Sequence, residues 1–279
     1  MKRKYAQISG QARSSLFLAD TIMAYLKTAR EPLQRLDLPW RKKLRHHYEA
    51  VIARVATDCP LCSGRAMGGR LCSGCLDDVQ RSMRFATLRC KVCCLALSTP
   101  LACPDCTSQP PAFDKVIAAF DYAQPGDLLI GHFKAGRRFG LARMLAEMLV
   151  SSINTATPKL PRNTILVPVP ASQASIRERG FNPAAEIARY LAQQLNLPCR
   201  PGLLMRRVEG GRQKHLTRAQ RAQSALQSYS CPVRVEHTNI AIVDDVLTTG
   251  STLHGIAREL KAAGAEKVFG LVLARTPYR

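Results

Sequence analysis

The chain has 279 residues, a length that favours two domains over one, and 46% of them are hydrophobic, which excludes a disordered tail protein. Lysine and arginine number 41 against 20 acidic residues, giving a formal net charge of +21. This surplus favours a polyanionic partner: nucleic acid first, then an acidic membrane surface, then phosphorylated metabolites. Charge alone does not exclude a basic protein without such a partner.

The first segment, residues 1–57, is basic, and we expect it to be a partly helical extension. It carries KRK at 2–4 and WRKKLRHH at 40–47, and apolar residues recur at helical spacing around Ser14–Ala29. It could be a nucleic-acid-binding arm or a solvated appendage. The true start could also lie inside it, at Met23.

Nothing in the sequence predicts a membrane span. The stretch Leu16–Leu26 is apolar but contains Asp20 and Thr21, and it lacks a small-residue cleavage site. A bilayer crossing needs about 20 apolar residues. We therefore expect an amphipathic helix here, and a cytoplasmic protein that could work at the inner face of the membrane.

A cysteine-rich segment follows, and it predicts a double zinc ribbon over residues 58–110. Nine of the 11 cysteines lie between Cys59 and Cys106, and eight of these nine form four CxxC pairs. Two such pairs supply the four thiolates of a structural zinc site. A disulfide framework would need an oxidising compartment, and a redox motif would need one pair beside a parallel strand. The expected ligands are Cys59, Cys62, Cys72, Cys75, Cys90, Cys93, Cys103 and Cys106.

The pairing of these knuckles is open between two patterns. Sequential pairing closes two short loops at a low entropic cost, whereas interleaved pairing would brace the two halves. We favour sequential pairing. Cys94 could replace Cys93 as a ligand, and Cys199 and Cys231 are expected to be ordinary thiols.

Residues 111–279 predict an α/β domain. Apolar strands that alternate with helices indicate a parallel sheet covered on both faces. Asn182 is the expected N-cap of one helix, and Gly264 is expected to end another. The expected strands are 115–122, 164–170, 240–245 and 267–275, and the expected helices are 127–150, 182–195 and 251–263.

The third strand ends in IAIVDD and leads into a turn of small residues. Ligands of open parallel sheets collect at the carboxyl ends of the strands, where Asp244 and Asp245 lie. Gly250 permits close approach of the backbone, and the helix that follows presents free amides. The turn therefore predicts a phosphate site, and the carboxylates suit sugar hydroxyls or a magnesium shell. No GxxxxGK[ST] motif is present, so a nucleotide P-loop is a poor match.

The stretch IAIVDDVLTTGST resembles the phosphoribosyl pyrophosphate (PRPP) signature of type I phosphoribosyltransferases. Together with the cysteine knuckles, VPVP and RGFN, it makes the chain similar to the ComF/GntX family of competence-associated, phosphoribosyltransferase-like proteins. The resemblance covers roughly residues 58–279. It implies a type I phosphoribosyltransferase-like fold, structural zinc, and PRPP bound with magnesium.

By this resemblance, individual residues receive roles. Asp244 and Asp245 would contact the ribose and magnesium. The family's mobile loop has an Asn where this chain has Ser224, and Lys134 is the part of GHFKAG that carries over. The remaining expected contacts are Leu247, Thr248, Thr249, Gly250 and Ser251 for the 5′-phosphate, Ala171, Ser172, Arg177 and Arg179 for pyrophosphate, and Arg212, Gln213 and Arg221 in the mobile loop.

Three functions are compatible with these features. The first is a ComF-like accessory protein of DNA uptake that binds single-stranded DNA and PRPP, with the uptake machinery as a partner. The second is an active phosphoribosyltransferase acting on a base or an amine, although no general base beyond His215 or His254 is evident and Phe181 is the nearest aromatic for base stacking. The third is a zinc-ribbon module that binds partners on an inert scaffold.

Overall fold

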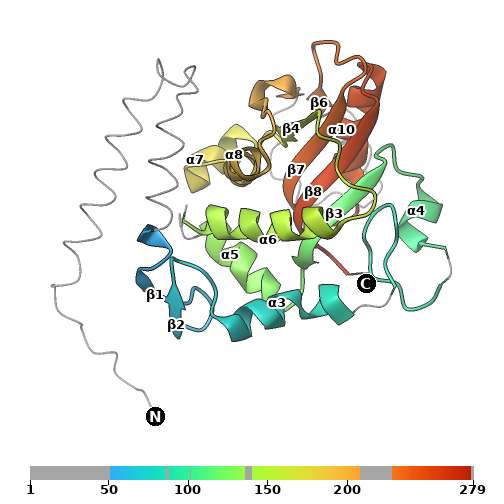
Figure 1. Ribbon diagram of the computed structural model, residues 1–279. Coiled ribbons are helices and arrows are strands. Elements are labelled where there is room, and N and C mark those ends of the chain that lie inside the picture. The colour runs from blue at the N-terminus through green and yellow to red at the C-terminus, as the bar shows by residue number, and fades with distance from the viewer. Residues whose placement is uncertain (1–50, 86–87, 101, 136–139, 208–227, 278–279) are drawn as a thin grey trace, which may run out of the picture. The chain divides into compact units, whose positions relative to one another are not determined.

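The computed structural model describes residues 51–279 except 86–87, 101, 136–139, 208–227 and 278–279 (Figure 1). Contacts divide the chain into two units, Met1–Arg54 and Val55–Arg279, and the second holds every element described below. The helix expected around Ser14–Ala29 lies outside the described residues. Within the described part of the chain, no helix has both the length and the apolar character that a bilayer crossing requires.

The centre of the second unit is a parallel four-stranded sheet in the order β3-β8-β7-β4. Its strands are β3 (Lys115–Asp121), β4 (Thr164–Pro168), β7 (Asn239–Leu247) and β8 (Lys267–Arg275). All four correspond to strands expected from continuously apolar runs, and the predicted parallel sheet is confirmed. Such runs occur because both faces of a parallel sheet are buried.

The register leaves the end of β7 uncovered on one side. Pro168, the last residue of β4, pairs with Val243, whereas β7 stays paired with β8 as far as Leu247 and Arg275. Residues 244–247 therefore extend beyond β4, and β8 is their only strand neighbour among the described residues. This is the edge at which the sequence places the acidic pair.

Helices cover both faces of the sheet (Figure 1). On one face lie α5 (Gly126–Ala135), α6 (Leu141–Thr155) and α8 (Pro183–Leu195), and on the other lies α10 (Ser251–Ala262). Asn182 caps α8 by accepting the Ala184 amide at 3.1 Å, as expected. Gly264, with a φ of 102°, follows the end of α10.

The expected single helix Asp127–Val150 is wrong, because the structure has two helices there. The first ends at Ala135 and the second begins at Leu141, after Gly140. Gly136 and Gly140 are both poor helix formers, and two of them close together weaken the case for an unbroken helix.

The cysteine segment belongs to the same cores as the sheet. Cys59 and Val79 lie in the cluster on the α6 face, and Cys93, Leu95 and Cys103 lie in the cluster on the α10 face. The boundary at residues 110 and 111 stays a prediction. The smaller elements are β1 (Ala56–Asp58), β2 (Arg65–Met67), α3 (Ser73–Phe85), α4 (Pro104–Ser108), α7 (Gln173–Arg179), η1 (Pro201–Leu203), β5 (Met205–Arg206) and β6 (Tyr229–Ser230).

The outer edge of β4 is occupied by neighbouring backbone. The Leu166 amide donates to the Pro198 carbonyl at 2.8 Å, and the Leu166 carbonyl accepts from the Arg200 amide at 2.9 Å. The Thr164 amide donates to Pro161 at 3.2 Å, and Pro168 has no amide hydrogen. The residues of β4 that face outward thus have no amide donor to spare.

Close packing of α10 on the sheet predicts the effect of enlarging Gly270. A Cβ there would lie 2.5 Å from Leu253 Cδ2 and 3.1 Å from Val116 Cγ2, so Gly270→Ala should lower the free energy of unfolding by about 1–3 kcal/mol. Urea unfolding followed by circular dichroism measures this change. Gly131→Ala is the control: its Cβ would meet nothing within 4 Å on helix α5, and alanine should stabilise by about 0.5–1 kcal/mol. Equal stability of Gly270→Ala and the parent would contradict the packing described.

Candidate functional site

The eight CxxC cysteines form two groups in the sequential pairing that we favoured. In each group the Sγ atoms all lie within 4.8 Å of one another. We call Cys59, Cys62, Cys72 and Cys75 the first tetrad, and Cys90, Cys93, Cys103 and Cys106 the second tetrad.

The sulfur geometry of both tetrads fits zinc. Four sulfurs about 2.3 Å from a tetrahedral zinc ion lie about 3.8 Å apart. The separation is 3.7 Å for Cys62 and Cys72 and 3.6 Å for Cys93 and Cys103. These values are far above the length of about 2.05 Å of a disulfide bond, and the cysteines are free. Each tetrad could therefore hold one zinc ion.

Backbone amides of the knuckles favour thiolates. In the first tetrad the Cys72 amide donates to Cys59 Sγ at 3.5 Å, and in the second the Cys93 amide donates to Cys90 Sγ at 3.4 Å. Burial opposes ionisation of Cys59, but the amides around it outweigh burial and lower its pKa to about 6. Amides that donate to the ligand sulfurs commonly orient and stabilise the thiolates of a cysteine metal site.

The other three cysteines lie outside the tetrads. Cys94 follows the Cys93 ligand with a φ of 61°, and its carbonyl accepts from Arg89 at 3.1 Å, so Cys93 rather than Cys94 completes the second tetrad. Cys231 donates to the Val233 carbonyl at 3.2 Å. Burial raises the pKa of Cys199, as expected for an ordinary thiol.

The acidic pair lies in the part of β7 that extends past β4. Asp245 forms an ion pair with Lys134 of α5 at 2.8 Å, and its amide donates to the Asp244 carboxylate at 2.9 Å. Burial and the neighbouring charge of Asp245 raise the pKa of Asp244 to about 7. Lys134 thus lies beside the acids, and one of the two carboxylates is poised between its charged and neutral forms.

The turn after β7 has the backbone geometry of an anion site. Gly250 has a φ of 81° and directly precedes α10, whose first amides have no partner within the helix. The Thr249 and Ser251 hydroxyls lie 2.9 Å apart, and Thr248 and Thr249 are exposed. The Leu247 side chain is buried, so Leu247 can offer a ligand only its backbone.

A second loop follows β4. Ser172 caps α7 by accepting the Ser175 amide at 3.1 Å, and Ala171 precedes it. Asn182, the N-cap of α8, donates to the Val169 carbonyl at 3.0 Å and so fixes the start of α8 to the residue that follows β4. Arg177 is exposed and Arg179 is half-buried. They are two residues apart on a helix, so their side chains leave it in different directions.

Several expected residues are not at the site or cannot be placed. Phe181 is buried and packs edge to face on Phe133, with ring centroids 5.5 Å apart, so it offers no face to a base. His254 accepts the Ala112 amide on Nδ1 at 3.1 Å, and burial lowers its pKa, which indicates a neutral structural side chain. The mobile-loop residues Arg212, Gln213 and Arg221, with His215 and Ser224, lie outside the described residues.

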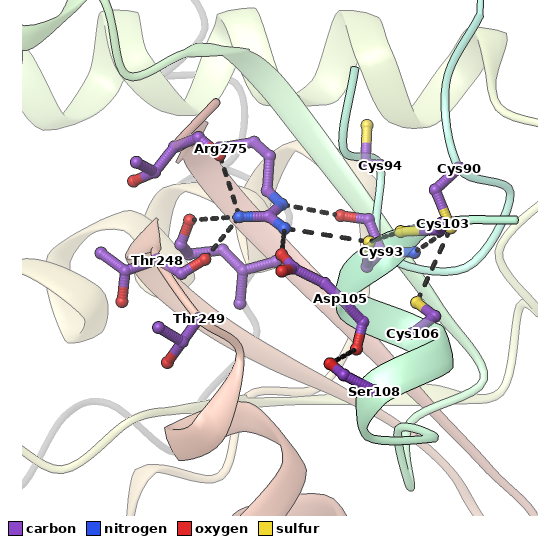
Figure 2. A network of polar contacts seen from close by, with 12 residues as sticks. Cys90, Cys93, Cys94, Cys103, Asp105, Cys106, Ser108, Thr248, Thr249 and Arg275 are labelled. Atoms are coloured by element: carbon purple, nitrogen blue, oxygen red, sulfur yellow. Dashed lines mark hydrogen bonds and ion pairs between the residues drawn. The ribbon is translucent and has the colours of Figure 1, made fainter. Parts of the chain in front are cut away.

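Sequence reasoning missed Arg275 and Asp105. Arg275 ends β8 with 2% of its surface exposed, and its guanidinium lies 2.6 Å from the Asp105 carboxylate (Figure 2). Arginine is rarely buried without a partner, so an arginine at the end of an otherwise apolar strand was the available signal. A cavity of about 490 Å³ opens beside this pair, and Gln109, Gly250 and Ser251 also line it.

Comparisons with known proteins agree with these features. A family model described as "Phosphoribosyl transferase domain" matches residues 174–278. Competence protein F of Haemophilus influenzae is 31% identical over 178 residues, 62% of this chain and 78% of that protein. DNA utilization protein YhgH of Salmonella typhi is 31% identical over 209 residues, 74% of this chain and 90% of that protein. Competence protein ComFC of Bacillus subtilis is 34% identical over 116 residues, 41% of this chain and 46% of that protein.

The raised pKa of Asp244 predicts a gain in stability when its charge is removed. The folded protein binds the Asp244 proton more tightly than the unfolded chain, so this group's contribution to stability falls as pH rises from about 4 to about 7. Asp244→Asn should therefore raise the free energy of unfolding by about 1–2 kcal/mol at pH 8, and less as pH falls toward 4.5.

Urea unfolding across this pH range measures the gain. Asp77→Asn is the control, because Asp77 forms an exposed ion pair with Arg84 on α3 and should give a small, pH-independent change. A gain from Asp244→Asn that is the same at every pH would show that Asp244 does not titrate as described.

Proposed function

The chain belongs to the ComF family of competence-associated proteins, and from this premise we propose that it is an accessory protein of DNA uptake that binds single-stranded DNA and PRPP, or a related phosphoribosyl ligand, with magnesium. The two tetrads would each hold a structural zinc ion. The single observation that carries the ligand proposal is the junction between β7 and α10. There the Asp244–Asp245 pair extends past β4 and leads directly into a glycine-opened turn.

This junction has the groups that a sugar phosphate requires. The amides at the start of α10, which have no partner within the helix, and the hydroxyls of Thr249 and Ser251 suit a terminal phosphate. Asp244 and Asp245 suit ribose hydroxyls and magnesium, which prefers oxygen ligands. Magnesium would also offset the repulsion between the two carboxylates, which Lys134 offsets in part without ligand. The two acids could therefore contact the ribose hydroxyls and magnesium at the same time.

Pyrophosphate would occupy the second loop, at the end of β4. This loop follows β4, which lies next to β7 in the parallel sheet. The loop and the acidic pair therefore lie at the same, carboxyl end of the strands. Ala171 and Ser172 would offer backbone amides, and Arg177 or Arg179 would offer positive charge. We propose that Arg212, Gln213 and Arg221, the residues expected in the mobile loop, also contact the pyrophosphate.

Binding of single-stranded DNA is supported by the formal charge of +21 and by the names of the relatives, which refer to competence and DNA utilization. Phosphate contacts supply most of the affinity in binding that does not depend on base sequence. The exposed cations that the structure describes include Lys91, Lys159, Arg162 and Arg200.

A second candidate is an active phosphoribosyltransferase. The specific observation that favours it is the complete Asp-Asp-Val-Leu-Thr-Thr-Gly sequence at the end of β7. Release of pyrophosphate from PRPP in the presence of a panel of bases and amines would distinguish an enzyme from a protein that only binds the ligand.

Removing both acids should abolish PRPP binding. Asp244→Asn combined with Asp245→Asn should weaken binding of magnesium-PRPP by at least about 100-fold, because both the hydroxyl contacts and the magnesium ligands are lost. Isothermal titration calorimetry measures the affinity, and metal analysis should still find the parent's zinc content. Asp77→Asn should bind as the parent does. A double variant with the parent's affinity would remove the acids from the site.

Affinity for single-stranded DNA should depend strongly on salt. Raising sodium chloride from about 50 to about 200 mM should weaken binding of an oligonucleotide by at least tenfold, because bound phosphates release counterions. Fluorescence anisotropy with a labelled oligonucleotide measures the affinity at each salt concentration. No binding at the lowest salt concentration, or an affinity that salt leaves unchanged, would contradict the DNA-binding proposal.

A further inference from the structure

A single buried guanidinium joins the second tetrad to the turn after β7 (Figure 2). On one side, Arg275 Nε donates to the Cys93 carbonyl at 3.1 Å, and Nη2 contacts Asp105 at 2.6 Å and Cys93 Sγ at 3.9 Å. On the other side, Nη1 donates to the Leu247 carbonyl at 3.3 Å and to the Thr248 carbonyl. The side chain therefore touches a metal-ligand candidate and the phosphate turn at once.

The position of this guanidinium depends on the second tetrad. A buried guanidinium is unfavourable unless carboxylates and carbonyls satisfy it. Its only carboxylate contact among the described residues is Asp105, which lies between the ligands Cys103 and Cys106 on the short helix α4. Two of its other contacts are to Cys93. Whatever fixes these cysteines thus also fixes the counter-ion of Arg275.

Arg275 in turn helps to position the turn, together with the Thr276 amide, which donates to the Leu247 carbonyl at 2.9 Å. A carbonyl bonded to the guanidinium is directed into the protein, and the peptide plane then directs the following amide the other way. Arg275 binds the carbonyls of both Leu247 and Thr248. It therefore helps to orient the amide that follows each carbonyl, which belongs to Thr248 and Thr249 respectively. Those amides lie in the segment that would hold the phosphate.

We propose that Arg275 is a positioning residue that couples metal occupancy of the second tetrad to the affinity of the phosphate turn. The ligand part of this inference rests on the proposed function. With the second tetrad empty, α4 and its Asp105 lose their anchor, and the turn loses its orientation. A further tie, the hydrogen bond from the Ala112 amide to His254 of α10, acts in the same direction.

The first tetrad provides an internal comparison. Its core residues lie in the cluster on the opposite face of the sheet. Its polar contacts with the helices include the hydrogen bond of 3.0 Å between His132 of α5 and the Pro60 carbonyl and the ion pair of 2.9 Å between Arg70 and Glu147 of α6. Among the residues that the structure describes, no hydrogen bond joins it to the turn after β7. Loss of metal from the first tetrad should therefore affect the phosphate turn much less.

Coupling of this kind is reciprocal. If metal in the second tetrad strengthens ligand binding, then ligand must strengthen metal retention by the same factor. Magnesium-PRPP should therefore slow zinc extraction by a chelating dye from the second tetrad and leave extraction from the first unchanged. A residue that merely held the fold together would not distinguish the two metals in this way.

The decisive variant is Asp105→Asn in the full-length chain, because it removes the counter-ion of Arg275 and keeps all eight ligands. It should retain the parent's zinc content and bind magnesium-PRPP about tenfold more weakly, measured by calorimetry. Asp77→Asn is the matched control. Cys103→Ser with Cys106→Ser should weaken binding further, and Cys72→Ser with Cys75→Ser should change it by less than about twofold.

Hydrogen exchange of the amides in residues 247–254 separates this inference from the proposed function. If the parent binds PRPP but Asp105→Asn binds equally well and PRPP leaves zinc extraction unchanged, the coupling is wrong. If the parent does not bind PRPP, the proposed ligand is wrong, and exchange decides the coupling by itself. Faster exchange at the turn in Asp105→Asn supports it, and unchanged exchange overturns it.

Discussion

A parallel sheet with two apolar faces must be covered on both sides, and this constraint organises the described part of the second unit. Helices α5, α6 and α8 cover one face, and α10 covers the other. The cysteine segment completes both layers, since Cys59 and Val79 join the first cluster and Cys93 and Leu95 join the second. Short irregular segments bury little apolar area and need an additional constraint, which four thiolates around a metal would provide.

In the proposed site, the acidic pair would set stability against binding. Two adjacent carboxylates at a half-buried position disfavour the folded protein without ligand, and the raised pKa of Asp244 expresses this cost. Lys134 reduces the repulsion by pairing with Asp245. Residues that lower stability in this way are typical of positions selected for a ligand rather than for the fold. The same reasoning explains why the acids sit where the sheet leaves room for a partner of opposite charge.

Much of this architecture could be predicted from sequence because its signals are local. The four strands are mostly apolar runs, and the spacing of the CxxC pairs predicts that two neighbouring pairs bring four sulfurs together. Asn182 and Gly264 mark the helix ends through short-range hydrogen bonding and backbone conformation. The two glycines between α5 and α6 were also visible, but helical periodicity on either side concealed the break.

Other features depend on contacts between distant residues and could not be predicted. Arg275 meets Asp105 across 170 positions of the chain, and Ala112 meets His254 across 142. Phe181 was only the nearest candidate for stacking on a base, and it fills a core position against Phe133, because its burial is decided by α5 and not by its own neighbours in sequence. Local patterns contain no information about such pairs.

The closed outer edge of β4 has a consequence for how copies of this protein can meet. An edge strand with free amides is a template on which another chain can add a strand, and long apolar edges promote aggregation for this reason. Here the amides of Leu166 and Thr164 already donate hydrogen bonds to adjacent loops, and Pro168 has no amide hydrogen. Growth of the sheet through this edge is therefore blocked, and any assembly at this side must use side chains of helices or loops.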